Sequence, residues 1–453
     1  MSDIEDIVIY KYYVKGKLLF KSPLVLGCGE ESNSDKDISR DWYGKVFIPA
    51  SGIAGPTRHY LDSILEDDKD QEHELIRQIF GEREKDSRQS LITFYDGDNM
   101  EKCVVNIRDG VAIDYFTKTA KDNAKYNYEI MEPGASCRFR IELTIRGNKD
   151  KNNDEMVSKF ENILFLVLEG STNGKIRIGA KTARGFGEIE LIETKILKLN
   201  MVKAEYRDKW LNFDWEDFKE GNLHLNNLTN SLKTIQNTTY ISVKFLIPYS
   251  MLIRAPNPNP SEEDVAHLSS NGEPVVSGTS WVGALRNAII QVARELDKIE
   301  QVKEIMEPLF GYVKTREKEP NYNIRAQKSR LFVNESDIEK SIPLNYTRNK
   351  IDRFTGGAVD TALFTEKAIF KGNVELNIWI KDAKEYEKGL VLLGIKELWH
   401  GLQPIGGGSN IGRGILKGVK IKLDAEEYDF KDFNDDFNDI FEKYFKSLTD
   451  VLV

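Results

Sequence analysis

The chain has 453 residues, of which 40% are hydrophobic and 30% are charged, and its formal net charge is −9. This balance describes a soluble globular protein of two to four domains, and it argues against indiscriminate nucleic-acid binding, which usually accompanies a basic chain. The three cysteines form no CxxC pair, so neither a zinc knuckle nor a disulfide framework is predicted. The acidic N-terminus does not read as a signal peptide and no apolar run is long enough to span a membrane, so we expect a cytoplasmic protein without membrane contact.

The first half predicts strands that alternate with two helical regions. Its elements, in chain order, are strands at 7–13 and 18–26, helices at 51–65 and 72–80, a strand at 90–95, a charged insertion at 104–128, a strand at 138–145, a helix at 154–169 and a strand at 187–192. Ser51 follows a Pro-Ala turn and is the expected N-cap of the first helix. This order is typical of a ferredoxin-like α+β unit with insertions.

The second half repeats the same order of elements. It predicts a strand at 241–247, a helix at 280–296, an insertion at 348–361, a strand at 374–380, a helix at 386–399 and a strand at 416–422. The segment that ends at Arg58 returns as the one that ends at Arg286, and IGAKTARGFG at 178–187 returns as IGGGSNIGRG at 405–414. We therefore predict an internal duplication, with domains at 1–194 and 238–453, an acidic tail closing the second, and a linker at 195–237.

Two kinds of loop are candidates for binding the phosphates of a phosphodiester backbone. The Gly-rich loops lack the GK[ST] ending of a P-loop, so nucleotide hydrolysis is not predicted. Such a loop can instead lay backbone N–H groups along a phosphodiester; the other reading is a tight loop that needs glycine only for positive φ. The turn before each first helix offers a further anion site. The candidate residues are Ser51, Arg58, Lys181, Thr182 and Arg184 in the first half, and Thr279, Ser280, Arg286, Ser409, Asn410 and Arg413 in the second.

An acidic loop precedes each of these turns. In the first half it carries Asp35, Asp37 and Asp41. Carboxylates beside a phosphodiester are tolerated when they hold a metal or accept a proton, whereas a solvated acidic loop is the alternative. His267 lies in the second acidic loop, and a structural histidine is the expected reading there.

Together these segments resemble the RAMP superfamily of CRISPR proteins, and specifically the backbone subunits of type III effector complexes. The resemblance rests on LGCGEESNSDKDISRD, GKVFIPASGIAGPTR and IGAKTARGFGEIEL in the first half, and on GEPVVSGTSWVGALR, NKIDRFTGGAVDTALF and IGGGSNIGRGILKGV in the second. It implies two tandem ferredoxin-like (RRM-like) RAMP domains with thumb-hairpin insertions, fused as in type III-D systems. The implied partners are a guide RNA, a target RNA and other subunits of the complex.

The resemblance also implies roles for single residues. Asp35 matches the position of a catalytic aspartate that cuts target RNA with a divalent metal such as Mg²⁺, and Asp37 is the second choice. The second loop departs from the pattern, and its candidates are Glu263 and Asp264. The thumbs imply RNA contacts for Arg108, Phe116, Arg348, Arg353 and Phe354. Two alternatives stay open: a scaffold that binds RNA without cutting it, and a stand-alone endoribonuclease for guide precursors, for which His59 is the candidate base.

Overall fold

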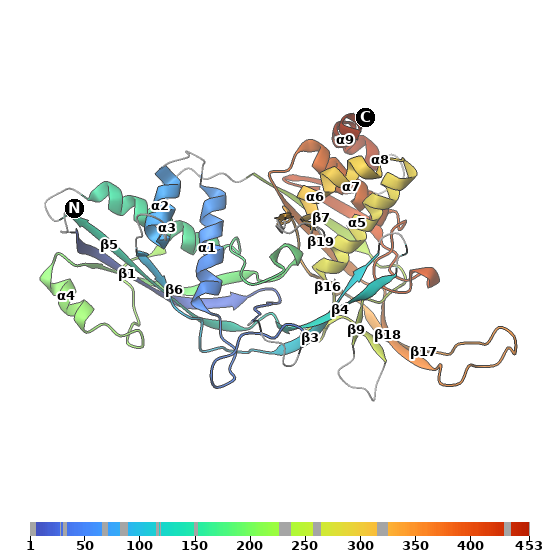
Figure 1. The fold of residues 1–453 in the computed structure, drawn as a ribbon, viewed down its shortest axis with the longest axis horizontal. Coiled ribbons are helices and arrows are strands. Elements are labelled where there is room, and N and C mark those ends of the chain that lie inside the picture. The colour runs from blue at the N-terminus through green and yellow to red at the C-terminus, as the bar shows by residue number, and fades with distance from the viewer. Residues whose placement is uncertain are drawn as a thin grey trace, which may run out of the picture. The chain divides into compact units, whose positions relative to one another are not determined.

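The computed structural model describes residues 6–27, 29, 34–65, 71–81, 89–114, 117, 119–148, 153–225, 237–256, 264–314, 325–429 and 436–452 (Figure 1). The chain forms two compact units. The first comprises Met1–Ile107, Tyr128–Thr182 and Phe186–Gln236, and the second comprises Arg108–Asn127, Ala183–Gly185 and Asn237–Val453. No helix in the described part of the chain is long and apolar enough to cross a membrane.

The first unit contains a four-stranded antiparallel sheet with the order β2-β5-β1-β6. Its strands are β1 (Asp6–Phe20), β2 (Ile92–Phe94), β5 (Ser136–Asn148) and β6 (Ile189–Asn200), and its helices are α1 (Ala50–Ile64), α2 (Gln71–Phe80), α3 (Asp154–Thr172) and α4 (Ala204–Leu211). Counted along the chain as strands 1 to 4, they lie in the sheet in the order 2-3-1-4. Helices α1 and α2 lie between β1 and β2 in the chain, and α3 lies between β5 and β6. This connectivity is that of a ferredoxin-like fold.

The core of the first unit lies between this sheet and the helices α1, α2 and α3, which cover one of its faces (Figure 1). Alternate β1 side chains, Tyr12, Val14, Leu18 and Phe20 among them, are buried there. From α3, Phe160, Ile163 and Val167 pack against them at helical spacing. The period of two in the strand and near 3.6 in the helix explains why the sequence pattern found both.

The second unit repeats this connectivity with additional strands. The central order is β15-β19-β7-β20, formed by β7 (Thr238–Leu246), β15 (Leu331–Val333), β19 (Asn373–Lys381) and β20 (Lys417–Leu423). Its helices are α5 (Gly278–Glu295), α6 (Ile299–Phe310), α7 (Glu385–Trp399), α8 (Asp436–Ile440) and α9 (Glu442–Leu452). Its smaller strands are β8 (Ser250–Met251), β9 (Arg254–Pro256), β10 (Val265–His267), β11 (Ser269–Ser270), β12 (Glu273–Val276), β13 (Tyr312–Lys314), β14 (Arg325–Gln327), β16 (Ser336–Glu339) and β21 (Glu426–Asp429).

Each repeat also carries a long hairpin at the predicted thumb. In the first it is formed by β3 (Val105–Ile113) and β4 (Ala120–Met131), and in the second by β17 (Ile342–Arg348) and β18 (Phe364–Phe370). Most of the first hairpin belongs to the second compact unit, in which Arg108 donates two hydrogen bonds, of 2.5 and 3.1 Å, to the Glu335 carboxylate. Arg108, a predicted RNA contact, is thus buried in an ion pair.

The predicted α+β fold of two tandem ferredoxin-like domains is confirmed, with local corrections. The strand expected at 7–13 and the first part of the strand expected at 18–26 form one strand, β1, which ends at Phe20 and whose register with β6 shifts between Lys15 and Lys17. Helix α1 begins at Ala50 with Pro49 as its N-cap, so the prediction of Ser51 as N-cap is wrong. The boundary predicted at 194 falls inside β6, and the segment predicted as a linker contains α4.

Candidate nucleic-acid interface

The acidic loop and the Gly-rich loop of the first repeat meet on one extended segment. The Val25 carbonyl accepts a hydrogen bond from the Ala180 amide at 2.8 Å, and the neighbouring Leu26 carbonyl accepts one from the Ser39 amide at 2.9 Å. Leu24, just before them, is paired with Met131 through two backbone hydrogen bonds of 2.9 Å. The structure therefore brings together three features predicted separately: the acidic loop, the Gly-rich loop and the foot of the thumb strand β4.

Two consecutive residues of β4 connect these loops through their side chains. The Glu129 carboxylate accepts hydrogen bonds from the Ile38 amide at 2.9 Å and from the Arg40 guanidinium at 2.9 and 3.0 Å. The Lys181 ammonium lies 3.3 Å from the centroid of the Tyr128 ring, a cation–π contact. Neither Tyr128 nor Glu129 was predicted as a site residue, because only the fold brings this strand to the two loops.

Within the acidic loop the two candidate aspartates have different surroundings. Asp37 is 5% exposed, and its carboxylate accepts hydrogen bonds of 2.8 Å from both the amide and the hydroxyl of Ser34. Asp35 is exposed. Asp37 thus shapes the loop, whereas the carboxylate of Asp35 is the one at the protein surface.

The described residues also bear on the expected metal. They contain no group of three or more His, Cys, Asp or Glu side chains that would enclose a metal ion. Magnesium, however, commonly binds through one or two carboxylates together with substrate phosphates and water. An exposed Asp35 fits that donor set, in which RNA would supply the remaining oxygens.

The second repeat has the same arrangement. The Gly407 amide donates to the Leu252 carbonyl at 2.7 Å, and the Leu268 amide donates to the Ile253 carbonyl at 2.8 Å. These two bonds correspond to those on Val25 and Leu26. Asp35 lies four residues before Ser39, and Asp264 lies four residues before Leu268, so the two candidates occupy equivalent positions.

Asp264 is held against the second thumb. Its carboxylate accepts a 2.7 Å hydrogen bond from the amide of Thr365 in β18, and its side chain is exposed. Its rival Glu263 lies outside the described residues. His267 is structural, as expected: Nδ1 accepts from the Ile253 amide and Nε2 therefore donates to the Val275 carbonyl, both at 3.1 Å, and burial lowers its pKa to about 4.

A glycine ends both Gly-rich loops at an equivalent position. Gly187 has φ +74° and Gly414 has φ +75°. A Cβ atom at either would lie within 2 Å of a carbonyl oxygen, Ile178 or Ile405 respectively, so no other residue fits. The alternative reading, that the loop needs glycine for its backbone, therefore holds at this position.

Several predicted RNA contacts have partners inside the protein. Arg413 is 2% exposed and donates to the Glu366 carboxylate at 2.9 Å, which also has Arg348 at 3.8 Å. Arg184 donates to the Phe310 carbonyl at 3.0 Å, and burial, followed by the nearby Arg286, lowers its pKa to about 10. Thr182 is buried. Arg184 and Arg348 are half-buried, and the RNA contacts of all four residues stay predictions.

Other predicted contacts lie at the surface. The exposed ones are Ser51, Arg58, Thr279, Arg353, Phe354, Ser409 and Asn410, and Phe354 is 98% exposed near the tip of the second thumb. Lys181, Ser280 and Arg286 are half-buried. Phe116 lies outside the described residues. His59, the base expected of a guide-processing enzyme, has an exposed side chain on α1.

Side chains of the protein itself bind the N-termini of α1 and α5, the two helix ends that were candidate anion sites. The Ala50 amide at the start of α1 donates to the Asp96 carboxylate at 2.7 Å. In the second repeat the Ser277 hydroxyl accepts from the Ser280 amide at 3.2 Å. Because side-chain oxygens already satisfy an amide at each site, the helix ends do not carry the argument for phosphate binding.

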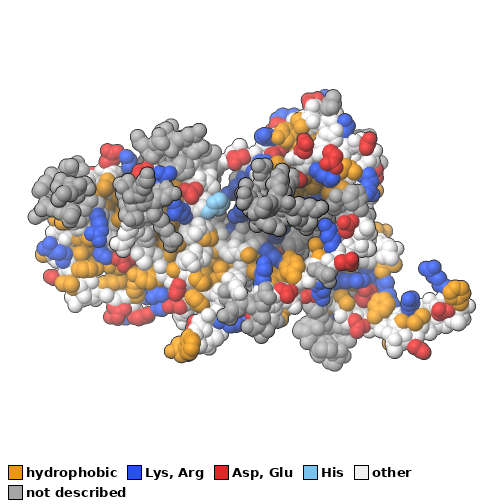
Figure 2. Space-filling model, viewed as in Figure 1, with side chains coloured by type: hydrophobic (Ala, Val, Ile, Leu, Met, Phe, Trp, Pro, Cys, Tyr) orange, Lys and Arg blue, Asp and Glu red, His pale blue; other side chains and the backbone are white. Residues whose placement is uncertain are grey.

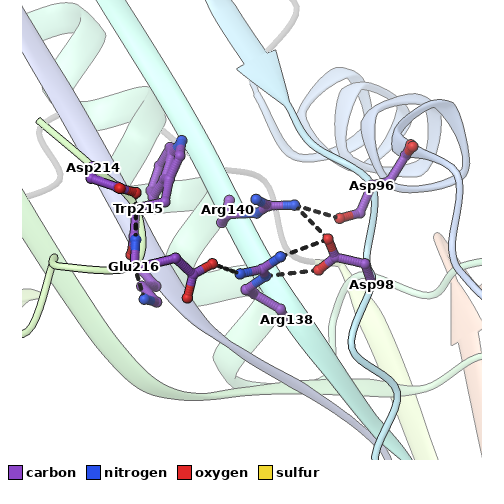
Figure 3. A network of polar contacts seen from close by, with 8 residues as sticks. Asp96, Asp98, Arg138, Arg140, Asp214, Trp215 and Glu216 are labelled. Atoms are coloured by element: carbon purple, nitrogen blue, oxygen red, sulfur yellow. Dashed lines mark hydrogen bonds and ion pairs between the residues drawn. The ribbon is translucent and has the colours of Figure 1, made fainter.

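The second face of the first sheet is not open either. In RRM-like proteins this face stacks RNA bases on aromatic side chains. Here Phe213 stacks on Tyr13, with ring centroids 4.0 Å apart, and Trp215 packs edge-on against both Tyr13 and Tyr95. Figure 3 shows Glu216, which follows Trp215 in the chain, paired with Arg138, which also binds Asp98 through two 2.7 Å hydrogen bonds. The protein's own chain thus occupies the place of an RRM platform.

Charge alone does not mark an RNA path. Among the described residues on the face shown in Figure 2, lysine and arginine side chains are interspersed with acidic ones. An RNA site in this acidic protein therefore has to be built from specific loops rather than from a general field.

The fold and these loops define the class of protein: two tandem ferredoxin-like domains, each with a thumb hairpin and a Gly-rich loop. The RAMP superfamily matches residues 17–190 and again residues 244–417, two segments of equal length that cover well over half of the chain. The chain belongs to the RAMP superfamily and holds two fused RAMP copies. Membership of this superfamily indicates a CRISPR-associated, RNA-binding subunit that works with other subunits. A comparison with curated proteins finds no match.

Proposed function

We propose that this protein is a guide-RNA-binding backbone subunit of a type III CRISPR effector complex, with two backbone units in one polypeptide as in type III-D systems. The observation that carries the proposal is that the acidic loop and the Gly-rich loop lie against the same backbone segment in both repeats. In each half, a loop with an exposed aspartate and a Gly-rich loop bind adjacent carbonyls of one segment at the foot of a thumb. That arrangement gives each half a place for one stretch of RNA backbone.

RNA binding in this proposal relies on contacts that read no sequence. Lys181 in the first repeat and Ser409 and Asn410 in the second lie on the Gly-rich loops, where they would contact phosphate oxygens. The exposed Phe354 offers a ring for stacking near the thumb tip. Such contacts hold a guide of any sequence, which a guide-binding subunit requires.

We further propose that the first repeat cuts the guide-paired target RNA. The ribose 2′-oxygen attacks the adjacent phosphorus, the bond to the 5′-oxygen breaks, and a 2′,3′-cyclic phosphate and a 5′-hydroxyl form. Asp35 accepts the 2′-hydroxyl proton, and water protonates the leaving oxygen. Asp37 is a positioning residue, because its carboxylate holds Ser34. A Mg²⁺ ion held by Asp35 and a phosphate would neutralise charge at the cut.

The test measures binding and cutting separately. Asp35→Asn should slow cleavage of a guide-paired target by about 10²–10⁴-fold and leave RNA affinity unchanged, since it removes a proton acceptor and no phosphate contact. EDTA should stop the wild-type reaction. Asp62→Asn, at an exposed aspartate of α1, is the matched control and should cut normally.

Three outcomes decide between the alternatives. Full cleavage by Asp35→Asn would remove the catalytic assignment. RNA binding without any cleavage by the wild type would favour the scaffold. A wild-type protein that binds no guide RNA would contradict the proposed function as a whole.

A further inference from the structure

The turn between the acidic loop and α1 carries two aromatic side chains that are almost fully exposed. Trp42 is 93% exposed and Tyr43 is 84% exposed. Among the large hydrophobic side chains that the structure describes, only Phe354 is more exposed than Trp42. Two neighbouring rings in water contribute little to folding, so another reason for them is needed.

The backbone beneath these rings is firmly held. The Asp41 carboxylate accepts hydrogen bonds from the Tyr43 amide at 2.9 Å and from the Lys45 amide at 2.8 Å. The Gly44 amide donates to the Asp41 carbonyl at 2.9 Å, and Gly44 has φ +76°, which favours glycine. Aspartate at the first position and glycine at the fourth suit a type I turn, whose two central positions accept most residues. The turn therefore fixes Trp42 and Tyr43 without requiring them.

The second repeat lacks this feature. Its corresponding turn joins β11 to β12 through Asn271 and Gly272, with φ +49° and +86°. No aromatic residue occurs there. The pair thus belongs to the repeat that carries Asp35, and the shared fold does not explain it.

We propose that Trp42 and Tyr43 form a stacking platform for an unpaired base of RNA, which extends the proposed RNA-binding function and rests on it. Trp42 lies seven residues after Asp35, at most about 25 Å of extended chain, so one strand can reach both. The exposed Lys45 directly follows the turn and suits the phosphate next to a stacked base, whereas Arg40, before the turn, already pairs with the Glu129 carboxylate. Trp and Tyr lose few rotamers on binding, and every base has a ring face to stack.

The experiment measures binding of fluorescein-labelled single-stranded oligoadenylate to the full chain over a range of salt concentrations. Trp42→Leu keeps apolar area but removes the ring, and should weaken binding by about 5- to 150-fold. Trp42→Phe keeps a ring and should retain most of the affinity. Neither variant should change the slope of affinity against salt, because no phosphate contact is lost. Tyr249→Leu, at an exposed aromatic of the second unit, is the control and should bind like the wild type.

Each other outcome overturns the platform. Wild-type affinity in Trp42→Leu would do so while leaving the RNA-binding function intact. Equal loss in Trp42→Leu and Trp42→Phe would show that an aromatic ring is not what binds. A reduced salt slope in Trp42→Leu would mean a backbone contact instead. If the wild type itself binds no RNA, the proposed function fails together with the platform. Equal melting temperatures of all variants would confirm that folding is unaffected.

Discussion

A contact between two side chains, found at equivalent positions in both repeats, shows how far the repeats have diverged at the residue level. Phe186 packs against Tyr128 in the first repeat, with ring centroids 6.3 Å apart. At the matching positions of the second, Arg413 and Glu366 form a buried ion pair of 2.9 Å. Both pairs join the Gly-rich loop to the descending thumb strand, so the joint is kept while its chemistry changes.

The first prediction concerns this ion pair. Arg413→Met should lower the free energy of unfolding by about 3–5 kcal/mol, because it leaves the Glu366 carboxylate buried without its nearest partner. Adding Glu366→Leu should restore much of that loss, since the unpaired charge is then gone. Urea unfolding of the three proteins measures this. A single variant as stable as the wild type would show that Arg254 and Arg348 already compensate for Arg413.

The second prediction concerns pH and His267. Burial lowers the pKa of His267 from 6.5 to about 4. Between these two pH values the imidazole is protonated in the unfolded chain and neutral in the folded chain. Stability should therefore fall as the pH drops from about 6.5 toward 4, by about 2 kcal/mol between pH 7.5 and pH 5. His267→Gln should lack this part of the loss. The measurement compares unfolding free energies at the two pH values, and an equal pH dependence in both proteins would contradict it.

At the scale of an element, we predict that the Gly-rich loop of the first repeat has one residue that contacts RNA, Lys181, and one that stabilises the fold, Arg184. Lys181→Ala should reduce the salt slope of single-stranded RNA binding by about 0.7 without changing base preference, because one phosphate contact is lost. Arg184→Ala should leave that slope unchanged and instead destabilise the protein by about 1–3 kcal/mol, since the Phe310 carbonyl loses its donor. Salt titrations and melting curves distinguish the two, and a reversed pattern would mean that the roles are exchanged.

Most elements could be predicted from the sequence because they depend on local periodicity. The helix predicted at 386–399 is α7, Glu385–Trp399, and the strand predicted at 374–380 is β19, Asn373–Lys381. Because the two halves repeat the same order of segments, each predicted element in one half was supported by its counterpart in the other. By contrast, the sequence predicts two strands in place of β1, because apolar side chains do not alternate over residues 14–17. The register with β6 shifts at this point, and only the pairing of the two strands reveals that shift.

The partners within the candidate site could not be predicted in the same way. Glu129 lies 91 residues from Ile38, and Glu366 lies 47 residues from Arg413. The sequence marked Arg413 and Arg184 as basic residues on a loop, which is also what an RNA contact looks like. Only tertiary structure distinguishes a buried ion pair from a surface cation, because burial on a loop has no periodic signal.

At the scale of the whole molecule, duplication provides two equivalent loop sets in one chain. Each set has its own aspartate four residues before an equivalent hydrogen bond, Asp35 before Ser39 and Asp264 before Leu268. If each set holds one stretch of RNA, a long target paired to the guide should meet two potential cutting positions. The carboxylate of the exposed Asp264 accepts a hydrogen bond from the Thr365 amide of the second thumb.

The most direct test is the product ladder of an end-labelled target RNA, cut by the guide-loaded protein in its complex. We predict that Asp35→Asn removes one set of products, that Asp264→Asn removes a different set if the second repeat is active and none if it only binds, and that guide binding persists in both. The double variant should show the sum of the two losses, because the aspartates belong to separate repeats. An unchanged ladder in Asp35→Asn, with guide and target still bound, would contradict the account.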